Sequence, residues 1–383
     1  MTTRTAAVTW SAANARRMER QGLTAPTALS PAGVVGTLLG AHAQVLSAAE
    51  LSVGLRTEGV TRAGVRDALW RERTLVKTFG PRGTVHLLPA DELPMWTGAL
   101  SALSFGRGSF AKDARMTPEQ TETVLTAIGD ALTGAELTVD ELSEAVVERA
   151  GAWAGDPVMP AFQGMWPRWR QVMHLAGHRG VLCFAPNRGR KVTYTRPDVV
   201  PLDGPAALTA LVRRYLHAYG PATPAHFAKW LALPPSPAAH LFEGLAARGE
   251  IEPVTYEGGP AWVGAGDTGF PAEPARGVRL LPYFDAFLIA SQPRERLFPG
   301  AAYTRALAGG QAGNYPVLLV DGTAAGVWHQ RRSGRRIAVT VEPLEPLPGR
   351  LLRELEAEVA RVGEVLEGNA ELTVGEVTVG PHA

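Results

Sequence analysis

The feature of this sequence that most constrains its fold is a pattern of three helices followed by a β-hairpin, which occurs three times along the chain. In the first copy, Ser30 and Pro31 predict a helix start, because serine caps free backbone N–H groups and proline suits the first helical position. Gly80-Pro81-Arg82-Gly83 predicts the turn of a hairpin. This order of elements is typical of a winged helix. The first copy is expected to have helices at 30–46, 51–55 and 62–71 and strands at 74–79 and 84–88.

The same pattern follows twice more at comparable spacing, which predicts three tandem winged helices. Thr138-Val139-Asp140-Glu141 resembles a capping box at a helix start in the second copy. The second copy is expected to have helices at 117–132, 138–150 and 166–176 and strands at 181–185 and 191–194. The third is expected to have helices at 207–219, 223–230 and 237–248 and strands at 251–256 and 261–263.

Composition changes after about Pro274, where strand-like runs predict an antiparallel β-barrel or a small sandwich. These runs are 278–281, 286–289, 317–320, 323–328 and 336–341, followed by a helix at 349–362 and a strand at 371–377. The fold class expected is therefore α+β. Its units are an N-terminal helix (1–27), winged helices at 28–116, 117–200 and 201–273, and the barrel with its terminal helix and strand (274–383).

The charge balance excludes binding of nucleic acid through bulk positive charge, since 38 basic and 37 acidic residues leave a net charge of +1. Any DNA binding must come from local patches. The longest apolar stretch, 34–55, is interrupted by His42, Gln44 and Glu50 and is not expected to span a membrane. The single cysteine, Cys183, excludes an internal disulfide and is expected in the core. The N-terminus has no signal-peptide pattern, so a cytoplasmic protein is expected.

Several short motifs occur in the order and spacing of a known family. They are Gly40-Ala41-His42-Ala43-Gln44, Leu75-Val76-Lys77-Thr78, Arg82-Gly83-Thr84-Val85-His86-Leu87, Leu280-Leu281-Pro282-Tyr283-Phe284-Asp285, and Val320-Asp321-Gly322 with Gly326-Val327-Trp328. Together they resemble the AlkZ/YcaQ family of winged-helix DNA glycosylases over about 29–377. The resemblance implies a C-shaped monomer, associated with the nucleoid, that clasps double-stranded DNA. It also implies excision of N-alkylated purines without a metal or other cofactor.

The family signature is a glutamine, an apolar residue and then glutamine or aspartate, and this chain has His42 in place of the first glutamine. Gln44 matches the second position. Two residues apart on a helix point about 200° away from each other, so we expect the helix to bend or stop near Gln44 for both to face one site. His42, with an ordinary pKa of about 6.5, is a candidate general base, and Gln44 is a candidate for positioning water. The alternative is that both are structural polar residues on a buried helix.

Asp285 is the third catalytic candidate, because its carboxylate follows Pro282 in an apolar and aromatic run. It is expected to face the sugar, to anchor His42, or to pair structurally with Arg294 or Arg296. His174 and His178 have the spacing of a helical zinc pair, but Gly177 and the lack of a nearby glutamate argue against it. No metal is expected.

Basic residues on the predicted hairpin turns are candidates for contact with DNA phosphates, which position a protein without reading base sequence. They are Arg82 in the first turn, Arg188, Arg190 and Lys191 in the second, and Arg331, Arg332 and Arg335 in the C-terminal unit. A winged-helix transcriptional regulator that senses a ligand through its barrel, and a catalytically inactive DNA-binding relative, are the alternatives. The sequence leaves the lesion open: simple alkylpurines, natural-product adducts or interstrand crosslinks, in general base excision repair or in self-resistance of a producer.

Overall fold

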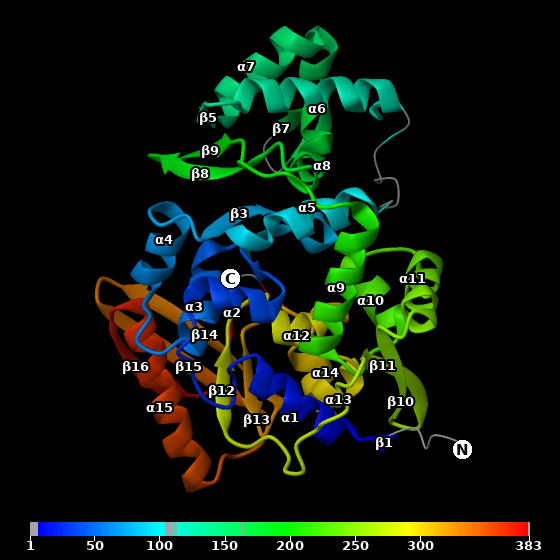
Figure 1. Cartoon of the computed structure of the whole chain (residues 1–383). Helices are drawn as coiled ribbons and strands as arrows, with labels where there is room; N and C mark the ends of the chain where they lie inside the picture. The colour runs from blue at the N-terminus through cyan, green and yellow to red at the C-terminus, as the bar shows by residue number, and fades with distance from the viewer. Residues whose placement is uncertain (1–6, 104–110, 112, 162–163, 382–383) are drawn as a thin grey trace.

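The computed structural model describes residues 7–103, 111, 113–161 and 164–381. Figure 1 shows the unit that contains α6–α8 at one end of the molecule, above β3 and α5, and the C-terminal sheet with α15 at the other end. Contacts of β3 with β8 and of α5 with α8 join the upper unit to the rest. The chain begins with β1 (Ala7–Val8) and α1 (Trp10–Arg20), close to the predicted N-terminal helix.

The first unit contains the predicted helices and hairpin, with one correction that bears on the site. The helix expected at 30–46 ends at Leu38, because Leu39 and Gly40 have φ values of 54° and 94° and turn the chain out of the helix. The chain then enters a short strand, so His42 lies on a strand and not on a helix. The elements are α2 (Pro31–Leu38), β2 (Ala41–His42), α3 (Leu46–Arg56), α4 (Arg62–Trp70), β3 (Leu75–Phe79) and β4 (Val85–Pro89), and the antiparallel sheet has the order β2-β4-β3.

The second unit has the same strand arrangement, β5-β9-β8, but its third helix differs from the prediction. The segment 166–176, expected to be one helix, is divided between a strand, a 3₁₀ turn and a short α-helix. The sequence analysis also missed the β6–β7 hairpin. The elements are α6 (Pro118–Leu132), β5 (Leu137–Thr138), α7 (Val139–Ala150), η3 (Ala152–Gly155), β6 (Pro157–Ala161), β7 (Gly164–Pro167), η4 (Arg168–Val172), α8 (Met173–His178), β8 (Cys183–Arg188) and β9 (Lys191–Thr195).

The third unit follows the expected order of helices and strands. Its hairpin forms a sheet of order β1-β10-β11, so the first strand of the chain pairs with a hairpin more than 240 residues later. An isolated bridge between Ala222 and Trp262 lies where the other two units have a short strand. The elements are α9 (Gly204–Tyr219), α10 (Pro224–Leu231), α11 (Pro235–Ala247), β10 (Ile251–Tyr256) and β11 (Gly259–Gly264), and α5 (Leu93–Ser101), after η1 (Pro81–Gly83) and η2 (Ala90–Glu92) of the first unit, packs on α9.

Among the described residues, the C-terminal unit is a five-stranded mixed sheet, so the predicted antiparallel barrel is not confirmed. The order β12-β13-β14-β15-β16 has two open edges, and the β15–β16 pair is parallel. The apolar run 286–289, expected to be a strand, is a helix because the Asp285 carboxylate caps it by accepting from the Phe287 N–H. The elements are β12 (Val278–Leu281), α12 (Ala286–Ala290), α13 (Arg294–Leu297), α14 (Ala301–Arg305), β13 (Val317–Val320), β14 (Thr323–Ser333), β15 (Arg336–Pro343), α15 (Gly349–Leu366) and β16 (Asn369–Val374).

Buried arginine side chains join units that are distant in sequence. Arg17 on α1 is 1% exposed and donates to the backbone carbonyls of Tyr219, Pro221 and Gln292. Because buried backbone carbonyls require donors, this one side chain holds the N-terminal helix, the end of α9 and the start of α13 together. Cys183 is buried, as predicted, and burial raises the pKa of its thiol to about 12. In the described part of the chain, every helix is too short or too polar to cross a lipid bilayer.

We predict that Gly326→Ala destabilises the C-terminal sheet. A Cβ at Gly326 would lie 2.2 Å from the backbone oxygen of Glu342 on β15, so the two strands must separate. Overpacking of this kind costs about 1–3 kcal/mol or more, measured by urea unfolding. A Cβ at Gly375 meets nothing within 4 Å, so Gly375→Ala is the matched control and should change stability by less than about 0.5 kcal/mol. Equal stability of both variants would contradict the tight approach of β14 to β15.

Candidate active site

Strand β2 places His42 at the centre of the first unit, facing His86 across the sheet. The two residues are direct partners in the β2–β4 register, and their rings meet edge to face with centroids 5.2 Å apart. His86 Nδ1 lies 2.9 Å from the Thr84 carbonyl oxygen. Since a carbonyl only accepts, this nitrogen carries the proton and Nε2 is the unprotonated one. Burial lowers the pKa of His86 well below its ordinary value, and the ring is neutral.

The His42 imidazole is itself buried and neutral. It is 8% exposed, and its ring lies against Phe284 with centroids 4.4 Å apart. Its Nδ1 is buried without a hydrogen-bond partner among the described residues. Burial, and then the positive charge of Arg82, lowers the pKa of His42 to about 3. Because a buried polar nitrogen normally has a partner, this one is available to a ligand or a water molecule.

His42 opens onto a cavity of about 370 Å³, within the range of about 300–1,000 Å³ typical of small-molecule sites. The walls come from the first hairpin turn, from α10, and from the segments around α12–α14. None of the described side chains that line it is a carboxylate, and several are cationic or amides. The lining residues besides His42 are Arg82, Thr84, His226, Lys229, Trp230, Phe284, Ile289, Ala290, Gln292, Arg294, Gln311, Ala312 and Asn314.

Phe284 is held against His42 by a strained turn. Its φ is 55°, a conformation that bulky residues rarely adopt and that persists only where surrounding contacts enforce it. Its backbone N–H donates to the carbonyl of Gly313 at 2.9 Å. A Cβ at Gly313 would lie 3.1 Å from the Phe284 Cα. The glycine therefore allows the close backbone approach that keeps the aromatic ring on the imidazole.

Asp285 fixes the other side of the same turn through an ion pair with Arg56. The guanidinium donates to both carboxylate oxygens at 2.7 and 2.8 Å, and both side chains are 0% exposed. The Ser52 hydroxyl and the Phe287 N–H complete the set of donors. The predicted structural pairing with Arg294 or Arg296 is wrong in its partner, because α3 places Arg56 beneath the turn. Asp285 lines no wall of the His42 cavity, and its lone pairs are occupied.

Gln44 lies at the bend between β2 and α3, two residues beyond His42, and is exposed. The predicted break in the helix exists, although it comes earlier than expected, at Leu39. In extended backbone, residues two apart share a side, but Gln44 lies outside the cavity lining. The structure thus brings His42 into the cavity and leaves Gln44 accessible beside it.

The basic residues predicted on hairpin turns differ in their surroundings. Arg82 has a φ of 62° and turns inward, lining the His42 cavity. Arg188 pairs with Glu141, and Lys191 pairs with Asp140 at 2.9 Å. Arg332 donates to the Leu366 carbonyl at 2.6 Å. The remaining three predicted side chains are exposed and have no ion-pair partner among the described residues: Arg190, Arg331 and Arg335.

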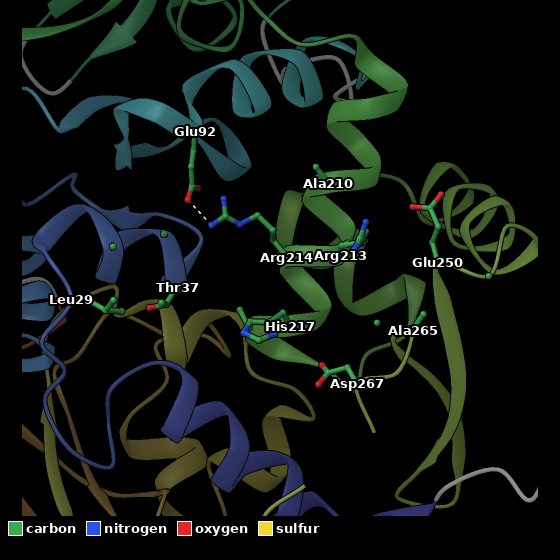
Figure 2. A pocket seen from close by; sticks show the side chains of 15 residues that line it. Leu29, Thr37, Glu92, Ala210, Arg213, Arg214, His217, Glu250, Ala265 and Asp267 are labelled. Atoms are coloured by element: carbon green, nitrogen blue, oxygen red, sulfur yellow. Dashed lines mark ion pairs between the residues drawn. The ribbon is translucent and has the colours of Figure 1, made fainter. Parts of the chain in front are cut away.

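A larger cavity of about 880 Å³ lies between α2 and α9. Figure 2 shows Glu92 reaching Arg214 across this space, with His217 further along α9, Asp267 near it on the segment after β11, and Arg213 on the side of Glu250. Its acidic residues take part in ion pairs with arginines, as in the 2.5 Å contact of Asp267 with Arg20. The charges of this cavity thus neutralise one another, whereas the described lining of the His42 cavity has cations and no carboxylate, so the His42 cavity is the better candidate for a nucleotide.

Among the described residues, no group of three potential ligands has the arrangement of a metal site. His178 Nε2 lies 3.1 Å from the Gly80 carbonyl oxygen and packs edge to face on His174. These two histidines join α8 to the first hairpin turn. Sequence reasoning did not predict that the cavity residues Lys229, Phe284 and Arg294 lie together with His42, because they come from different units. It also missed His86, which pairs with His42 but does not line the cavity. The quoted family motifs contain His86 and Phe284 and were the only signal for them.

We predict that Asp285→Ala destabilises the fold by about 3–5 kcal/mol, because it leaves the Arg56 guanidinium buried without its carboxylate. Urea unfolding measures this effect. The matched control is Glu295→Gln, an exposed carboxylate on α13 that forms no ion pair with the described residues, with an expected change below about 0.5 kcal/mol. The double variant Arg56→Met with Asp285→Leu replaces both charges by apolar side chains and leaves no unpaired charge buried. It should therefore recover much of the stability that the single variant loses. A single-variant loss under about 1 kcal/mol would contradict a fully buried pair.

Comparison with known proteins identifies the family of this chain. A model of the family described as DNA glycosylase AlkZ-like matches residues 35–365. A relative from Streptomyces sahachiroi, named interstrand DNA cross-link repair glycosylase, is 32% identical over 370 residues, 93% of this chain and 97% of the relative. The solved structure of Streptomyces sahachiroi DNA glycosylase AlkZ matches with a TM-score of 0.79 and 30% identity, covering 96% of this chain and 100% of that one. The family that the motifs indicate is confirmed, and the chain belongs to the AlkZ-like family of DNA glycosylases.

Proposed function

We propose that this DNA glycosylase is monofunctional and hydrolyses the N-glycosidic bond of purines alkylated at N7 or N3, with the His42 cavity as its active site. The observation that carries the proposal is a buried, neutral imidazole that opens onto a cavity without carboxylates. An alkylated purine is already cationic and leaves as a neutral base, so it needs no acid to protonate it. A site without a protonated carboxyl group is therefore compatible with this substrate class.

The reaction breaks the bond between the sugar C1′ and the purine nitrogen, and the base leaves with the bonding electron pair. Water then bonds to C1′ of an oxocarbenium-like state and loses a proton. The oxygen that attacks this state becomes positively charged and strongly acidic. His42, although its pKa of about 3 makes it a weak base, is sufficient to accept that proton and pass it to solvent. The products are an abasic site and the free modified base.

Gln44 acts from the mouth of the cavity in this proposal. Its amide carries both donor and acceptor atoms and is exposed beside the strand that carries His42. It would orient the water or contact the nucleotide once DNA covers the bend. Asp285 acts as a positioning residue, because its contacts hold the turn of Phe284 and not the reacting atoms.

The scaffold proposed around this site retains most of the predicted architecture. The three small sheets with their helices are interpreted as winged helices at 28–116, 117–200 and 201–273, preceded by the N-terminal segment 1–27 and followed by the sheet unit at 274–383. We propose a C-shaped monomer that binds duplex DNA and acts at the nucleoid in the cytoplasm. A transcriptional regulator is disfavoured because the chain belongs to an enzyme family.

Interstrand crosslinks and bulky adducts are part of the proposed substrate range, because the relative with 32% identity is named for crosslink repair. The exposure of Gln44 leaves that side of the site open to a large lesion. Self-resistance of a natural-product producer and general base excision repair would use the same chemistry. Excision assays with a crosslinked duplex and with N7-methylguanine DNA separate the two ranges.

We predict that His42→Ala lowers single-turnover excision of N7-alkylguanine by roughly 10²–10⁴-fold, and that Gln44→Ala loses at least as much. From the ordinary histidine pKa alone, the excision rate would fall as the pH drops through about 6.5. Burial, however, lowers the pKa of His42 to about 3. The competent neutral form is fully present above that value. The parental rate should therefore be constant between about pH 5 and 8, outside the titration of His42.

The control is His240→Gln, an exposed histidine on α11, which should excise at the parental rate. His42→Gln restores the residue of the family signature and should retain appreciable activity. If His42→Ala works at the parental rate, His42 is structural and the chemistry must rest on Gln44. Absence of abasic product from the parental enzyme on every alkylated substrate would support the inactive-relative alternative.

A second prediction concerns the exposed cations. Arg331→Gln with Arg335→Gln should weaken duplex binding and lower its salt dependence, because these side chains have no acidic partner among the described residues. Arg188→Gln with Lys191→Gln should weaken it less, because Glu141 and Asp140 already neutralise them. Fluorescence anisotropy over a salt series measures both pairs. A larger loss from the second pair would show that DNA displaces those acids.

A further inference from the structure

Three cationic side chains from three units of the chain line the His42 cavity. Arg82 comes from the first hairpin turn, Lys229 from α10 and Arg294 from the start of α13. The turn and α10 are in contact, and α10 also contacts α12. The fold thus brings together cations that are far apart in sequence.

We propose that Arg82, Lys229 and Arg294 form a phosphate-binding site that holds the DNA backbone on either side of the damaged nucleotide. This inference rests on the proposed function of the His42 cavity. It assigns to these residues the positioning of the lesion, and it leaves the chemistry at the sugar to His42 and Gln44.

The first argument is that these charges have no carboxylate partner. In the described part of the chain, none of the three takes part in an ion pair. Glu295, next to Arg294, is the nearest acid that acts on Lys229 and Arg294, and it bonds to neither. The Arg294 charge also opposes ionisation of Arg82 and Lys229. Grouped cations that repel one another in the free protein are satisfied by an anionic ligand.

The second argument is that the two guanidinium groups are held in place before any ligand arrives. Arg82 is fixed by its left-handed backbone and by donation to the Trp230 carbonyl at 2.9 Å. Arg294 donates to the Gly310 carbonyl at 3.0 Å, and its buried Nε has no partner among the described residues. Guanidinium groups with free donors suit the oxygens of a phosphodiester. Lys229 is exposed and adds a positive charge to the lining of the cavity.

The third argument comes from the reaction. Positive charge develops on the sugar during excision, and three uncompensated cations would oppose it. Phosphates bound to those cations cancel their field and place negative charge beside the sugar. The cavity therefore becomes suited to the reaction when the backbone of the substrate itself occupies it. The larger cavity on α9 lacks this arrangement, since acids face its arginines (Figure 2).

The test is a salt series of duplex binding, measured by fluorescence anisotropy with the full-length enzyme. The probe is a duplex with a central tetrahydrofuran, an abasic-site analogue, compared with the same undamaged duplex. Lys229→Gln and Arg294→Gln should each reduce the salt slope on the abasic analogue by about 1, and together by about 2. The undamaged duplex should lose less, and Arg294→Lys should keep the parental slope.

Arg213→Gln is the matched control, because it removes one positive charge from α9 in the other cavity. It should leave the slope on the abasic analogue unchanged. The Lys229 side chain is exposed and makes no hydrogen bond with the part of the chain that the structure describes, so its variant should keep the parental Tm. If the variants fold but keep the parental salt slope, the phosphate-binding site is overturned. If they lose the same slope on the abasic and undamaged duplexes, the position of the site beside the lesion is overturned. Failure of the parental enzyme to excise alkylpurines overturns the proposed function instead, whatever the slopes.

Discussion

The buried ion pair between Arg56 and Asp285 is the interaction on which the site depends. Removing both charges from water is costly, and the attraction between them offsets that cost only with good geometry and full hydrogen bonding. Here the pair is bidentate, Ser52 donates to the carboxylate, and the guanidinium also reaches the Gln21 carbonyl. Since α3 belongs to the first unit and Asp285 to the last, this pair fixes how the two meet.

The position of His42 follows from that contact. Asp285 caps α12, and the preceding residue, Phe284, is thereby held in a left-handed conformation against the imidazole. On the opposite side, the β2–β4 pairing sets His42 against His86. The imidazole is confined between two rings, and its lost hydration accounts for the low pKa. Stability and the proposed chemistry therefore depend on the same contacts, so a substitution at Asp285 is expected to disturb both.

Sequence reasoning was most successful where a local pattern carried the signal. Glycine and proline around Arg82 predicted the first hairpin, and the motif containing His42 lies in a segment that lines the cavity. The strand at Ala41–His42 was missed because the apolar pattern that follows Pro31 continues past Leu39. The pattern alone therefore does not show that the helix ends there. The partner of Asp285 was missed for a different reason: Arg56 is 229 residues away, and no local period records a pairing of that range. The barrel prediction counted residues 286–289 as a strand, because this short run is as apolar as a buried strand. In the structure Asp285 caps the run, and it forms a helix.

The histidine that departs from the family signature is consistent with the physical demands of its surroundings. A glutamine amide is neutral at every pH, whereas a solvent-exposed imidazole is partly cationic near neutrality. In this cavity, burial and the neighbouring Arg82 keep the His42 ring neutral, so it offers a lone pair as an amide oxygen does. A planar ring also stacks on Phe284, which a flexible amide does less well. The exchange therefore retains a neutral acceptor in the cavity and gains rigidity, at the expense of a stronger dependence on the turn that holds Phe284.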